Sequence, residues 1–535
     1  MQNQIIKSKV QALWDRLWSG GLSNPITAIE NISYLLFMKR LEIFKEGLLD
    51  EYKWSKYHHL SGQALVTKLN KVFDYIQNSL AEEDEPFARA MKQARFTLTD
   101  KPASLSKDAI KYIDEIYLEI DNEIELNNQH FQDIQGDLYE YLLKQTSEAG
   151  KNGQFRTPRH IIQLMASILD PDVDGKICDL ASGSAGFLVG AYQHILTKYS
   201  KKISIDPIDK LPKGTDGKLF DEKENIGKLE KLKTTTFYGF DIDQTMVRIG
   251  MMNLMMHGIT HPNIEDCDTL SLGYEKLVAE KLNLKLNVES EKSIQNKKLQ
   301  GQFKYILANP PFTGKINSET VSVNLNRVYK PKIDKEGKRK KQTVQSELLF
   351  LERMVYMLEE GGKACVIVPE GVLFNSGRAH KATRQILMTD CDLEGVISLP
   401  SGVFQPYTTV KTSILIFKKR KYRNGLDKPQ DVNVWFFGME SDGYSLDNNR
   451  KELKEKPLPI VLKEWKDRES KPQDDRKLDH FKIPYTEIEE NGYELNFNLY
   501  KEFVYEKQNF KPSSDILKEI KLLEKSINEG IKELG

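Results

Sequence analysis

Between Gly150 and about residue 425, short apolar runs rich in β-branched and aromatic residues alternate with longer amphipathic stretches, and this alternation limits the possible folds. The runs are KICDLA, TTFYGFDI, FKYILANP, KACVIVP and TSILIFKK, and the stretches between them include HIIQLMASIL, FLVGAYQHIL, VRIGMMNLMMH and SELLFLERMVYMLEE. Apolar residues three and four apart indicate helices, whereas short β-rich runs indicate strands. Alternating strands and helices predict a doubly wound α/β sheet.

The chain of 535 residues is longer than a single hydrophobic core usually holds, and its pattern predicts three parts. Residues 1–148 repeat apolar residues at helical spacing and predict a helical N-terminal domain, and residues 149–425 hold the predicted α/β domain. Residues 426–535 are charged, interrupted by prolines and end in a helix. The apolar stripe of that helix needs a surface to pack on, either on its own domain or on a partner. Candidate caps before the helix are Ser513, Ser514 and Asp515. The stripe consists of Ile516, Ile520, Leu523, Ile527, Ile531 and Leu534.

Composition argues against several classes of protein. The four cysteines are widely spaced and the nine histidines form no HxxxH pair, so neither a metal site nor a disulfide framework is expected. No apolar run approaches the ~20 residues that span a bilayer, and the charged, amphipathic start MQNQIIKSKVQALWDRLW leaves no room for a secretion signal, which predicts a cytoplasmic protein without a membrane partner. Because the formal net charge is zero, a partner would have to supply much of the grip on any nucleic acid.

The segment KICDLASGSAGFLVGAY predicts a strand, a glycine-rich turn and a helix, an arrangement that brings a ligand close to backbone N–H groups. Gly183 and Gly186 have the spacing GxxG, which differs from the dinucleotide-binding GxGxxG and argues against an NAD-dependent oxidoreductase. Asp179 ends this strand, and Asp241 and Asp268 end two others at the same edge of the sheet. Acidic side chains there can accept hydrogen bonds from ribose hydroxyls, so together they predict a nucleoside-cofactor site, although each alone is more often a turn or cap residue.

The segment LANPPFTG follows another predicted strand. A proline after Asn309 keeps that residue out of the α region, and Pro310 and Pro311 offer carbonyls but no N–H groups. The side-chain oxygen of Asn309 and the carbonyl of Pro310 can accept hydrogen bonds from an exocyclic amino group, while an exposed Phe312 stacks on the ring that carries it. Two acceptors favour a tetrahedral amine whose lone pair can attack, which is catalysis by positioning and electrostatics. A proline-rich loop that only caps the strand is the alternative.

Taken in order, these segments resemble those of the amino-group DNA methyltransferases, and more closely the modification (M) subunit of type I restriction-modification systems. GQFRTPRHIIQLM is similar to that family's cofactor-binding segment, DLASGSAGFL to its glycine loop, FYGFDID to its ribose-binding strand, CDTL to its adenine-binding strand end and NPPF to its catalytic tetrapeptide. The segments LWDRLW and GDLYEYLL and the C-terminal helix resemble the same subunit. The resemblance implies a Rossmann-like S-adenosylmethionine-dependent methyltransferase sheet with a helical N-terminal domain and a C-terminal helical tail.

The resemblance also implies a cofactor, an acceptor and their residues. S-adenosyl-L-methionine would donate a methyl group to the N6 amino group of an adenine in DNA, flipped out of the duplex. Asp241 would bind the cofactor ribose, Asp268 its adenine amino group, and Ile242 would pack on that adenine. The full set implied for the cofactor is Phe155, Thr157, Pro158, Asp179, Ala181, Gly183, Ser184, Gly186, Phe187, Asp241, Ile242, Asp268 and Asn309. The set implied for the target is Asn309, Pro310, Pro311 and Phe312, with Phe404 as a second stacking ring or, alternatively, a core residue.

The chain departs from that family's pattern at three positions. Ala185 stands where a glycine is common in the loop, Arg156 stands where an aromatic residue is frequent, and Asp241 replaces a more usual glutamate. An alanine is compatible with the loop unless its backbone φ is positive. These departures bear on cofactor affinity more than on the type of reaction.

Two polar insertions, near residues 200–233 and 315–342, interrupt the alternation of strands and helices. The second insertion carries the basic run VYKPKIDKEGKRKKQ (residues 328–342). We expect this run either to contact DNA phosphates or to be a solvated insertion. No segment resembles a sequence-reading module. The resemblance implies a specificity (S) subunit that selects the site, with two M subunits per S, a restriction (R) subunit in the full complex, and the terminal helix as the docking element. Other amino acceptors (protein glutamine, RNA, cytosine N4) and a non-catalytic cofactor-binding scaffold remain alternatives.

Overall fold

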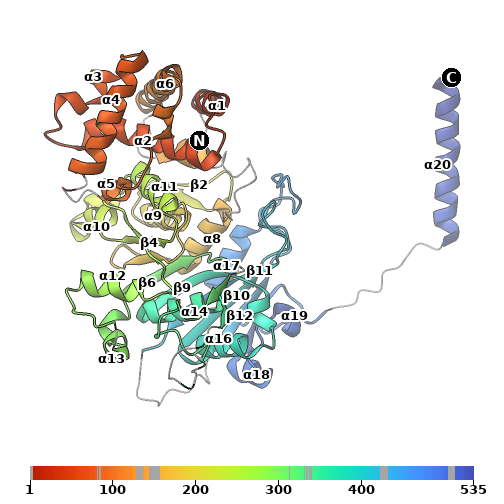
Figure 1. Ribbon diagram of the computed structural model, residues 1–535. Helices are drawn as coiled ribbons and strands as arrows, with labels where there is room; N and C mark the ends of the chain where they lie inside the picture. The colour runs from red at the N-terminus through yellow and green to blue at the C-terminus, as the bar shows by residue number, and fades with distance from the viewer. Residues whose placement is uncertain are drawn as a thin grey trace.

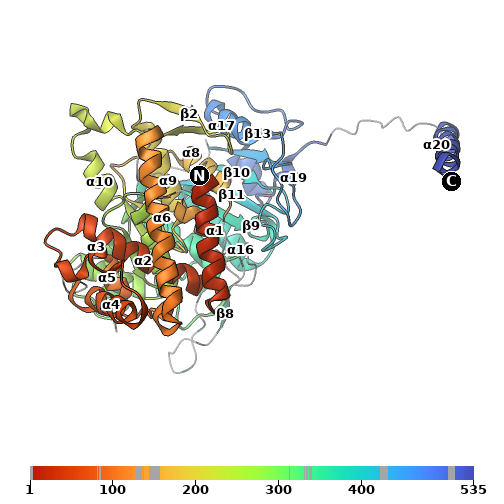
Figure 2. The same cartoon turned by 90° about the horizontal axis from the view of Figure 1, so that it is seen from above.

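The described parts of the chain form a group of N-terminal helices, a large sheet covered by helices, and a C-terminal helix that stands apart (Figure 1). The view from above shows the N-terminal helices α1 (Gln4–Ser19) and α6 (Ala103–Asn127) side by side (Figure 2). The computed structural model describes residues 4–80, 82, 86–127, 135–136, 138–143, 157–288, 290–312, 314–330, 332, 335, 340, 342–421, 432–503 and 513–534.

Within the described residues the sheet has nine strands, which confirms the predicted α/β fold. In their order across the sheet they are β13 (His480–Pro484), β12 (Asn433–Gly438), β10 (Cys391–Ser398), β11 (Thr412–Lys419), β9 (Leu358–Pro369), β6 (Phe303–Ala308), β1 (Ile177–Asp179), β4 (Phe237–Asp241) and β5 (Asn263–Asp266). The strands β9, β6, β1, β4 and β5 are parallel to their neighbours in this group. β11 runs antiparallel to β9 and β10, and β13 runs antiparallel to β12.

The connection order reverses direction at β1. After β1 the chain adds β4 and β5 on one side, and it then returns to the other side of β1 to form β6. The loops that follow β1 and β6 therefore leave the same edge of the sheet in opposite directions and open a crevice between them. Ligands of open α/β sheets bind in such crevices.

Alternate strand residues point into two separate cores, as the period of two in a β-strand requires. In β6, Tyr305 and Leu307 belong to one core, whereas Ile306 and Ala308 belong to the other. The first core is covered by α8 (Arg159–Leu169), α9 (Gly186–Lys198) and α11 (Gln244–Met256). The second core is covered by α12 (Gly273–Lys281), α14 (Ser346–Met357) and α16 (Arg378–Thr389).

The N-terminal helices are α1 (Gln4–Ser19), α2 (Pro25–Phe44), α3 (Trp54–Tyr57), α4 (Gly62–Tyr75), α5 (Pro86–Met91) and α6 (Ala103–Asn127), and residues 138–143 are also helical. α2 begins where the Asn24 side chain accepts hydrogen bonds from the N–H groups of Ile26 and Thr27, with a proline at the first helical position. The buried residues of these helices belong to the same core as α8, α9 and α11, so the N-terminal region packs on the helices that cover one face of the sheet.

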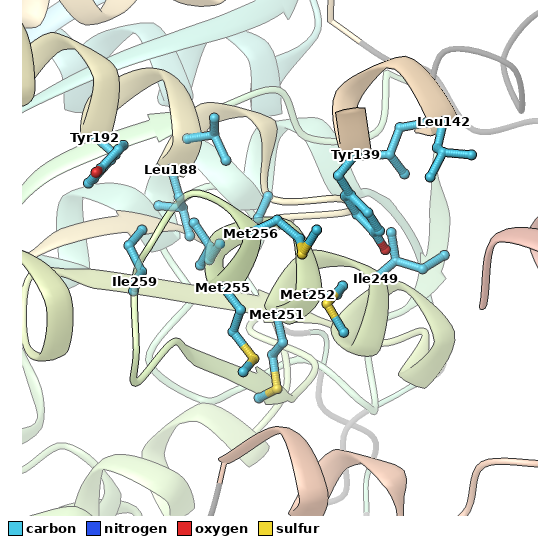
Figure 3. Close-up of a cluster of buried hydrophobic side chains, with 14 of the residues drawn as sticks. Tyr139, Leu142, Leu188, Tyr192, Ile249, Met251, Met252, Met255, Met256 and Ile259 are labelled. Carbon is cyan, nitrogen blue, oxygen red and sulfur yellow. The ribbon is translucent and has the colours of Figure 1, made fainter. Parts of the chain in front are cut away.

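Helix α11 lies between the sheet and the N-terminal helices. Every residue from Met246 to Met256 is buried, and a helix that is buried on all sides must lie between two layers. Figure 3 shows its methionines together with Tyr139 and Leu142 from the N-terminal region and Leu188 from α9. Methionine side chains adapt to irregular gaps, which suits an interface between two layers.

The remaining elements lie at the edges of the sheet and in the insertions. The insertion near 200–233 forms a hairpin of β2 (Ile203–Ile205) and β3 (Pro212–Gly214) followed by α10 (Lys228–Thr234), and the one near 315–342 is flanked by the paired β7 (Lys315–Asn317) and β8 (Thr343–Gln345). The other helices are α13 (Glu291–Ile294), α15 (Gly371–Phe374), α17 (Leu458–Asp467), α18 (Tyr485–Glu490) and α19 (Phe497–Tyr500). Short 3-10 helices span Asp50–Tyr52, Thr97–Asp100, Lys218–Asp221, Lys223–Asn225 and Lys297–Leu299, and a π-helical turn spans Ile76–Leu80.

The last helix, α20 (Ser513–Leu534), stands away from the rest of the molecule (Figure 1). The strands β12 and β13 follow residue 425 and still belong to the main sheet, so the sheet continues past the limit predicted for the α/β domain. The domain limits at residues 148 and 425 therefore stay predictions. Within the described residues, no helix is both long enough and apolar enough to cross a membrane.

Candidate active site

The glycine-rich turn after β1 is fixed by backbone hydrogen bonds to the neighbouring strand β4. The Ser182 N–H donates to the Phe240 carbonyl at 2.8 Å. The Gly183 N–H donates to a carboxylate oxygen of Asp241, also at 2.8 Å. Gly183 has a φ of +48°, and no heavy atom lies within 4 Å of the position that a Cβ would take. The backbone at Gly183 therefore faces open space, so a ligand can approach the main chain closely.

Ala185 adopts the left-handed conformation, with a φ of 61°. This is the one condition under which an alanine was expected to be unfavourable, and the cost is about 1–2 kcal/mol for a residue with a Cβ. The loop still closes, because the Ala185 N–H donates to the Ser182 carbonyl at 2.7 Å and α9 begins at the next residue. The substitution therefore strains the loop and leaves its shape intact.

Two carboxyl groups lie side by side beneath this loop. Asp179 is 1% exposed, and this burial raises the pKa of its carboxyl to about 8, although the Ala181 N–H donates to it at 3.1 Å and the nearby Asp241 adds a smaller upward effect. Burial also raises the pKa of Asp241, against the effect of the Asp243 and Gly183 N–H groups that donate to it. The raised pKa values of the buried Asp179 and the half-buried Asp241 favour a positively charged ligand, which would ionise both carboxyl groups.

Asn309 follows β6 directly and is oriented by Thr157, as its Nδ2 donates to the Thr157 Oγ1 at 2.9 Å. The Oδ1 atom of Asn309 is buried, and no described group donates a hydrogen bond to it. Pro310 and Pro311 have no N–H groups, so their backbone cannot donate a hydrogen bond to this oxygen. A buried amide oxygen without a partner costs free energy, so its presence next to a cavity points to a ligand that donates a hydrogen bond.

Phe312 and Phe404 contact each other edge to face, with ring centroids 5.4 Å apart and an interplanar angle of 89°. The prediction of an exposed Phe312 is wrong for this structure, because its side chain is 5% exposed. Phe404 is 1% exposed and belongs to the core, as the alternative interpretation of that residue expected. The two rings lie close enough to act on the same ligand, but in this structure they fill the space between themselves.

A cavity of about 340 Å³ connects these groups. Of the residues predicted for the site, those that line it are Thr157, Asp179, Ala181, Gly183, Ser184, Gly186, Phe187, Asp241, Asn309, Pro310, Pro311 and Phe312. The structure therefore brings together the predicted glycine loop, two of the three carboxylates and the whole NPPF segment. These segments come from three strand ends that are far apart in the sequence.

The other predicted residues are not in the lining of this cavity. Asp268 lies two residues beyond β5 at the same edge of the sheet, is exposed and accepts a hydrogen bond from the Leu270 N–H at 3.0 Å. Ile242 is 74% exposed and Pro158 precedes α8. Phe155 and Arg156 lie outside the described residues. The predicted roles of Asp268 and Ile242 would require a ligand that extends out of the cavity over β4 and β5.

Several lining residues were not anticipated. They are Ile162 of α8, Ser182 of the loop, Asp243, Met246 and Ile249 around the start of α11, and Ile26, Ile29 and Leu143 of the N-terminal region. The Ser182 and Asp243 positions adjoin predicted site residues and could have been included on that ground. The apolar residues carry no local signal, because a buried isoleucine at helical spacing is the ordinary pattern of a core helix.

A sequence model of N-6 DNA methylases matches residues 130–509, which is more than half of the chain. The chain belongs to the N-6 DNA methylase family. The matched residues of this family member contain the glycine loop, the acidic strand ends and the NPPF segment, whereas α1 to α6 lie outside them.

Curated relatives of this N-6 DNA methylase include subunits of type I restriction enzymes. The methylase subunit of the type I restriction enzyme EcoEI from Escherichia coli is 27% identical over 453 residues, which cover 81% of this chain and 77% of that protein. The methylase subunit of EcoKI from Escherichia coli strain K12 is 25% identical over 450 residues, which cover 83% of this chain and 72% of that protein. These relatives confirm the predicted resemblance.

A chain from a solved structure that concerns assembly and conformational transition of a type I R-M system shares the fold. It superposes with a TM-score of 0.64 at 19% sequence identity and covers 100% of this chain and 98% of its own length. At this identity the similarity concerns the fold alone. It extends over the N-terminal helices and the sheet together.

Proposed function

We propose that this protein transfers a methyl group from S-adenosyl-L-methionine to the N6 amino group of adenine in DNA, as the modification subunit of a type I restriction-modification complex in the cytoplasm. The buried, unpartnered Oδ1 atom of Asn309, at a cavity that Asp179, Asp241 and Asp243 also line, carries the proposal. Membership of the N-6 DNA methylase family and the names of the relatives support it.

The residues present fit this cofactor. S-adenosyl-L-methionine carries a sulfonium and an ammonium group. The acids Asp179 and Asp241, whose pKa values are raised, line the cavity and favour a cation. The open space at Gly183 lets a ligand approach the loop backbone. Thr157, Asp179 and Gly183 would hold the methionine part, Asp241 the ribose, and Asp268 and Ile242 the adenine. The cofactor would supply an electrophilic methyl group.

The NPPF segment would activate the acceptor. The exocyclic nitrogen of adenine is a poor nucleophile because its lone pair is delocalised into the ring. The Asn309 Oδ1 and the Pro310 carbonyl would each accept a hydrogen bond from the amino group. These two hydrogen bonds would favour a tetrahedral nitrogen. The new C–N bond then forms as the S–C bond breaks, the sulfonium becomes a thioether, and the nitrogen loses one proton to solvent. No covalent enzyme intermediate is required.

The target adenine must leave the duplex to reach Asn309. Stacking on Phe312 would offset part of that cost, since base–aromatic contacts contribute about 1–3 kcal/mol. Because Phe312 and Phe404 touch edge to face, entry of a base requires one ring to turn aside. We propose Phe312 and Phe404 as the stacking pair on this basis.

DNA and protein partners belong to the same proposal. The formal net charge of zero makes weak intrinsic DNA binding the expectation, and a specificity subunit would supply most of the affinity and the site selection. Of the basic run, Lys330, Lys332, Lys335 and Lys340 are described, whereas Lys338, Arg339 and Lys341 lie outside the described residues. The exposed stripe on α20 is the candidate docking surface for the specificity subunit, in an assembly of two modification subunits per specificity subunit that a restriction subunit would complete.

The deciding experiment measures transfer of a labelled methyl group to mixed-sequence DNA by the chain co-expressed with a specificity subunit, followed by identification of the modified nucleoside. We expect N6-methyladenine, and we expect Asn309→Ala to abolish it. The control is Asn491→Ala, an exposed asparagine after α18 that should leave transfer unchanged. Label in protein, RNA or N4-methylcytosine would move the acceptor to another class, and cofactor binding without any transfer would favour a scaffold.

A further inference from the structure

The cavity of the candidate site is not closed by the sheet edge alone. Ile26 and Ile29 of α2 line it together with the glycine loop residues Gly183 and Ser184. Ile29 is fully buried in the core and Ile26 is half-buried and packed against it, and both line the cavity. α2 belongs to the N-terminal region, which lies outside the part of the chain that matches the methylase family.

A nearly buried ion pair holds α2 against α11 at this point. Arg248 of α11 contacts Glu30 of α2 through its Nε at 2.7 Å and its Nη2 at 2.5 Å. The side chains are 7% and 12% exposed. The same guanidinium donates to the Thr245 Oγ1 at 3.1 Å and to the Ala90 carbonyl at 3.4 Å. A nearly buried guanidinium with fixed donors tolerates little displacement, so Glu30 fixes the adjoining turns of α2.

The helix that carries Arg248 also supports the glycine loop. Asn253 of α11 donates from Nδ2 to the Ser184 carbonyl at 2.8 Å. Gly250 lies so close to the loop that a Cβ at this position would meet the Gly183 carbonyl oxygen at 2.9 Å. One helix therefore contacts α2 on one side and the loop backbone on the other, and the two walls of the cavity are linked through it.

A second bridge joins the N-terminal region to the other end of the site. Glu140 pairs with Arg159 at 3.0 Å, and Arg159 is the first residue of α8. The two residues before it are Thr157, which orients Asn309, and Pro158. Leu143, in the same helical turn region as Glu140, lines the cavity. The N-terminal region thus contacts the site at α2 and again beside Thr157.

We propose that the N-terminal helical region is a structural part of the cofactor site, with Ile26 as a binding residue and the Glu30–Arg248 pair as the contact that positions it. The inference rests on the proposed function, because it assigns S-adenosyl-L-methionine to this cavity. Ile26 extends the apolar part of the cavity wall onto α2. Cofactor affinity therefore depends on the position of α2 relative to the glycine loop. Movement of the N-terminal helices would change that affinity.

Equilibrium binding of S-adenosyl-L-homocysteine to the full chain, measured by calorimetry, tests the inference. We expect Ile26→Ala to weaken binding roughly three- to tenfold, because it removes apolar surface from the cavity wall. The matched control is Ile43→Ala on the same helix, where the side chain is 68% exposed, and it should bind as the wild type does. Asp241→Ala, which tests the cofactor site itself, should weaken binding more than tenfold.

These variants separate the two claims. Unchanged binding by Ile26→Ala together with weak binding by Asp241→Ala overturns the inference and leaves the proposed function standing. Failure of the wild-type chain to bind, or normal binding by Asp241→Ala, rejects the assignment of the cofactor to this cavity and the inference with it. A melting curve for each variant identifies any loss that comes from unfolding.

Hydrogen exchange gives a readout that does not depend on Ile26→Ala being folded. The ligand should slow amide exchange in the first turns of α2 in the wild type, as well as in the glycine loop. Glu30→Gln, which neutralises the positioning contact, should weaken binding and reduce the protection of α2, and Glu30→Asp should restore part of both. Protection confined to the glycine loop and the segment around Thr157 would overturn the inference.

Discussion

The Asp179 carboxyl is buried under the glycine loop with a pKa raised to about 8, and this one group makes the molecule sensitive to pH. In the unfolded chain an aspartate has a pKa of about 3.9. Between these two values the native state binds a proton that the unfolded state has lost, so the free energy of unfolding decreases as pH rises. A cationic ligand would therefore favour ionisation of the Asp179 carboxyl. Without the ligand, the buried carboxyl lowers the free energy of unfolding as pH rises.

We predict that Asp179→Asn removes this pH dependence. Relative to Asp179→Asn, the wild type should lose up to roughly 4 kcal/mol of unfolding free energy between pH 5 and pH 8. Chemical denaturation at both pH values, without ligand, measures the difference. Asp474→Asn, at an exposed position, is the control and should track the wild type. A constant difference between wild type and Asp179→Asn at the two pH values would contradict the raised pKa.

The Thr157 Oγ1 accepts a hydrogen bond from the Asn309 Nδ2 at 2.9 Å, so we propose that Thr157 acts on the reaction through Asn309. We predict that Thr157→Val lowers kcat about tenfold, because the amide loses the hydrogen bond that sets its orientation. Thr157→Ser keeps the acceptor and should restore most of the rate. Steady-state methylation kinetics test this.

The cofactor KM separates a positioning role from a binding role of Thr157. If Thr157→Val raises the cofactor KM and leaves kcat unchanged, Thr157 contributes binding and does not position Asn309. Thr389→Val, at an exposed threonine that ends α16, should change neither constant.

At the scale of elements, the segment after NPPF is anchored by a fully buried ion pair. Arg353 of α14 contacts Glu275 of α12 at 2.8 Å, and both side chains are 0% exposed. Glu275 also accepts hydrogen bonds from the Ser322 Oγ at 2.8 Å and the Asn324 Nδ2 at 2.9 Å. Two helices and the chain that leaves the NPPF segment therefore meet at one carboxylate.

We predict that Arg353→Leu costs about 3–5 kcal/mol of unfolding free energy, because it leaves Glu275 buried without its countercharge. The double variant Glu275→Leu with Arg353→Leu should recover much of that loss, since an apolar pair needs no compensation. Denaturant titration measures both, and Arg378→Leu at an exposed position should stay within about 0.5 kcal/mol of the wild type. A double variant as unstable as Arg353→Leu would show that hydrogen bonding, and not charge, holds the segment.

The elements that the sequence predicts well are those with a local signal. Asp179, Asp241 and Asn309 each follow a short apolar run directly, so the placement of all three at one sheet edge follows from parallel strands alone. β12 and β13 were missed, because their apolar runs NVWFFG and HFKIP lie in a charged stretch. The cavity wall at Ile26 and the pairing of Glu30 with Arg248, 218 residues away, depend on tertiary packing that no local pattern records. The burial of Phe312 against Phe404 was missed for the same reason.

At the scale of the whole molecule, the exposed apolar surface is concentrated on α20. Ile516, Ile520, Leu523, Ile527 and Ile531 lie on one stripe and are each at least 44% exposed. The helix stands apart from the body (Figure 1), so the stripe is not part of either core. An amphipathic helix with an uncovered apolar face is a common element of helix-mediated assembly.

We predict that removal of residues 504–535 leaves the fold intact and abolishes assembly with the specificity subunit. The melting temperature should stay within about 2 °C of the wild type, because none of the described α20 side chains belongs to either core. Cofactor binding should also be unchanged, whereas co-purification with the specificity subunit should be lost. Since the formal net charge of zero gives the chain little intrinsic affinity for DNA, methylation should fall with it.

Substitutions within the helix make this prediction more specific. Ile520→Glu with Ile527→Glu charges the stripe and should reproduce the assembly defect of the truncation, whereas Lys521→Glu with Lys525→Glu changes the polar residues beside it and should retain assembly. Assembly of the truncated chain at wild-type strength would mean that another surface docks the partner. In that case the N-terminal helices, which contact the cofactor site, become the next surface to test, and a partner bound there would change cofactor affinity as well as DNA affinity.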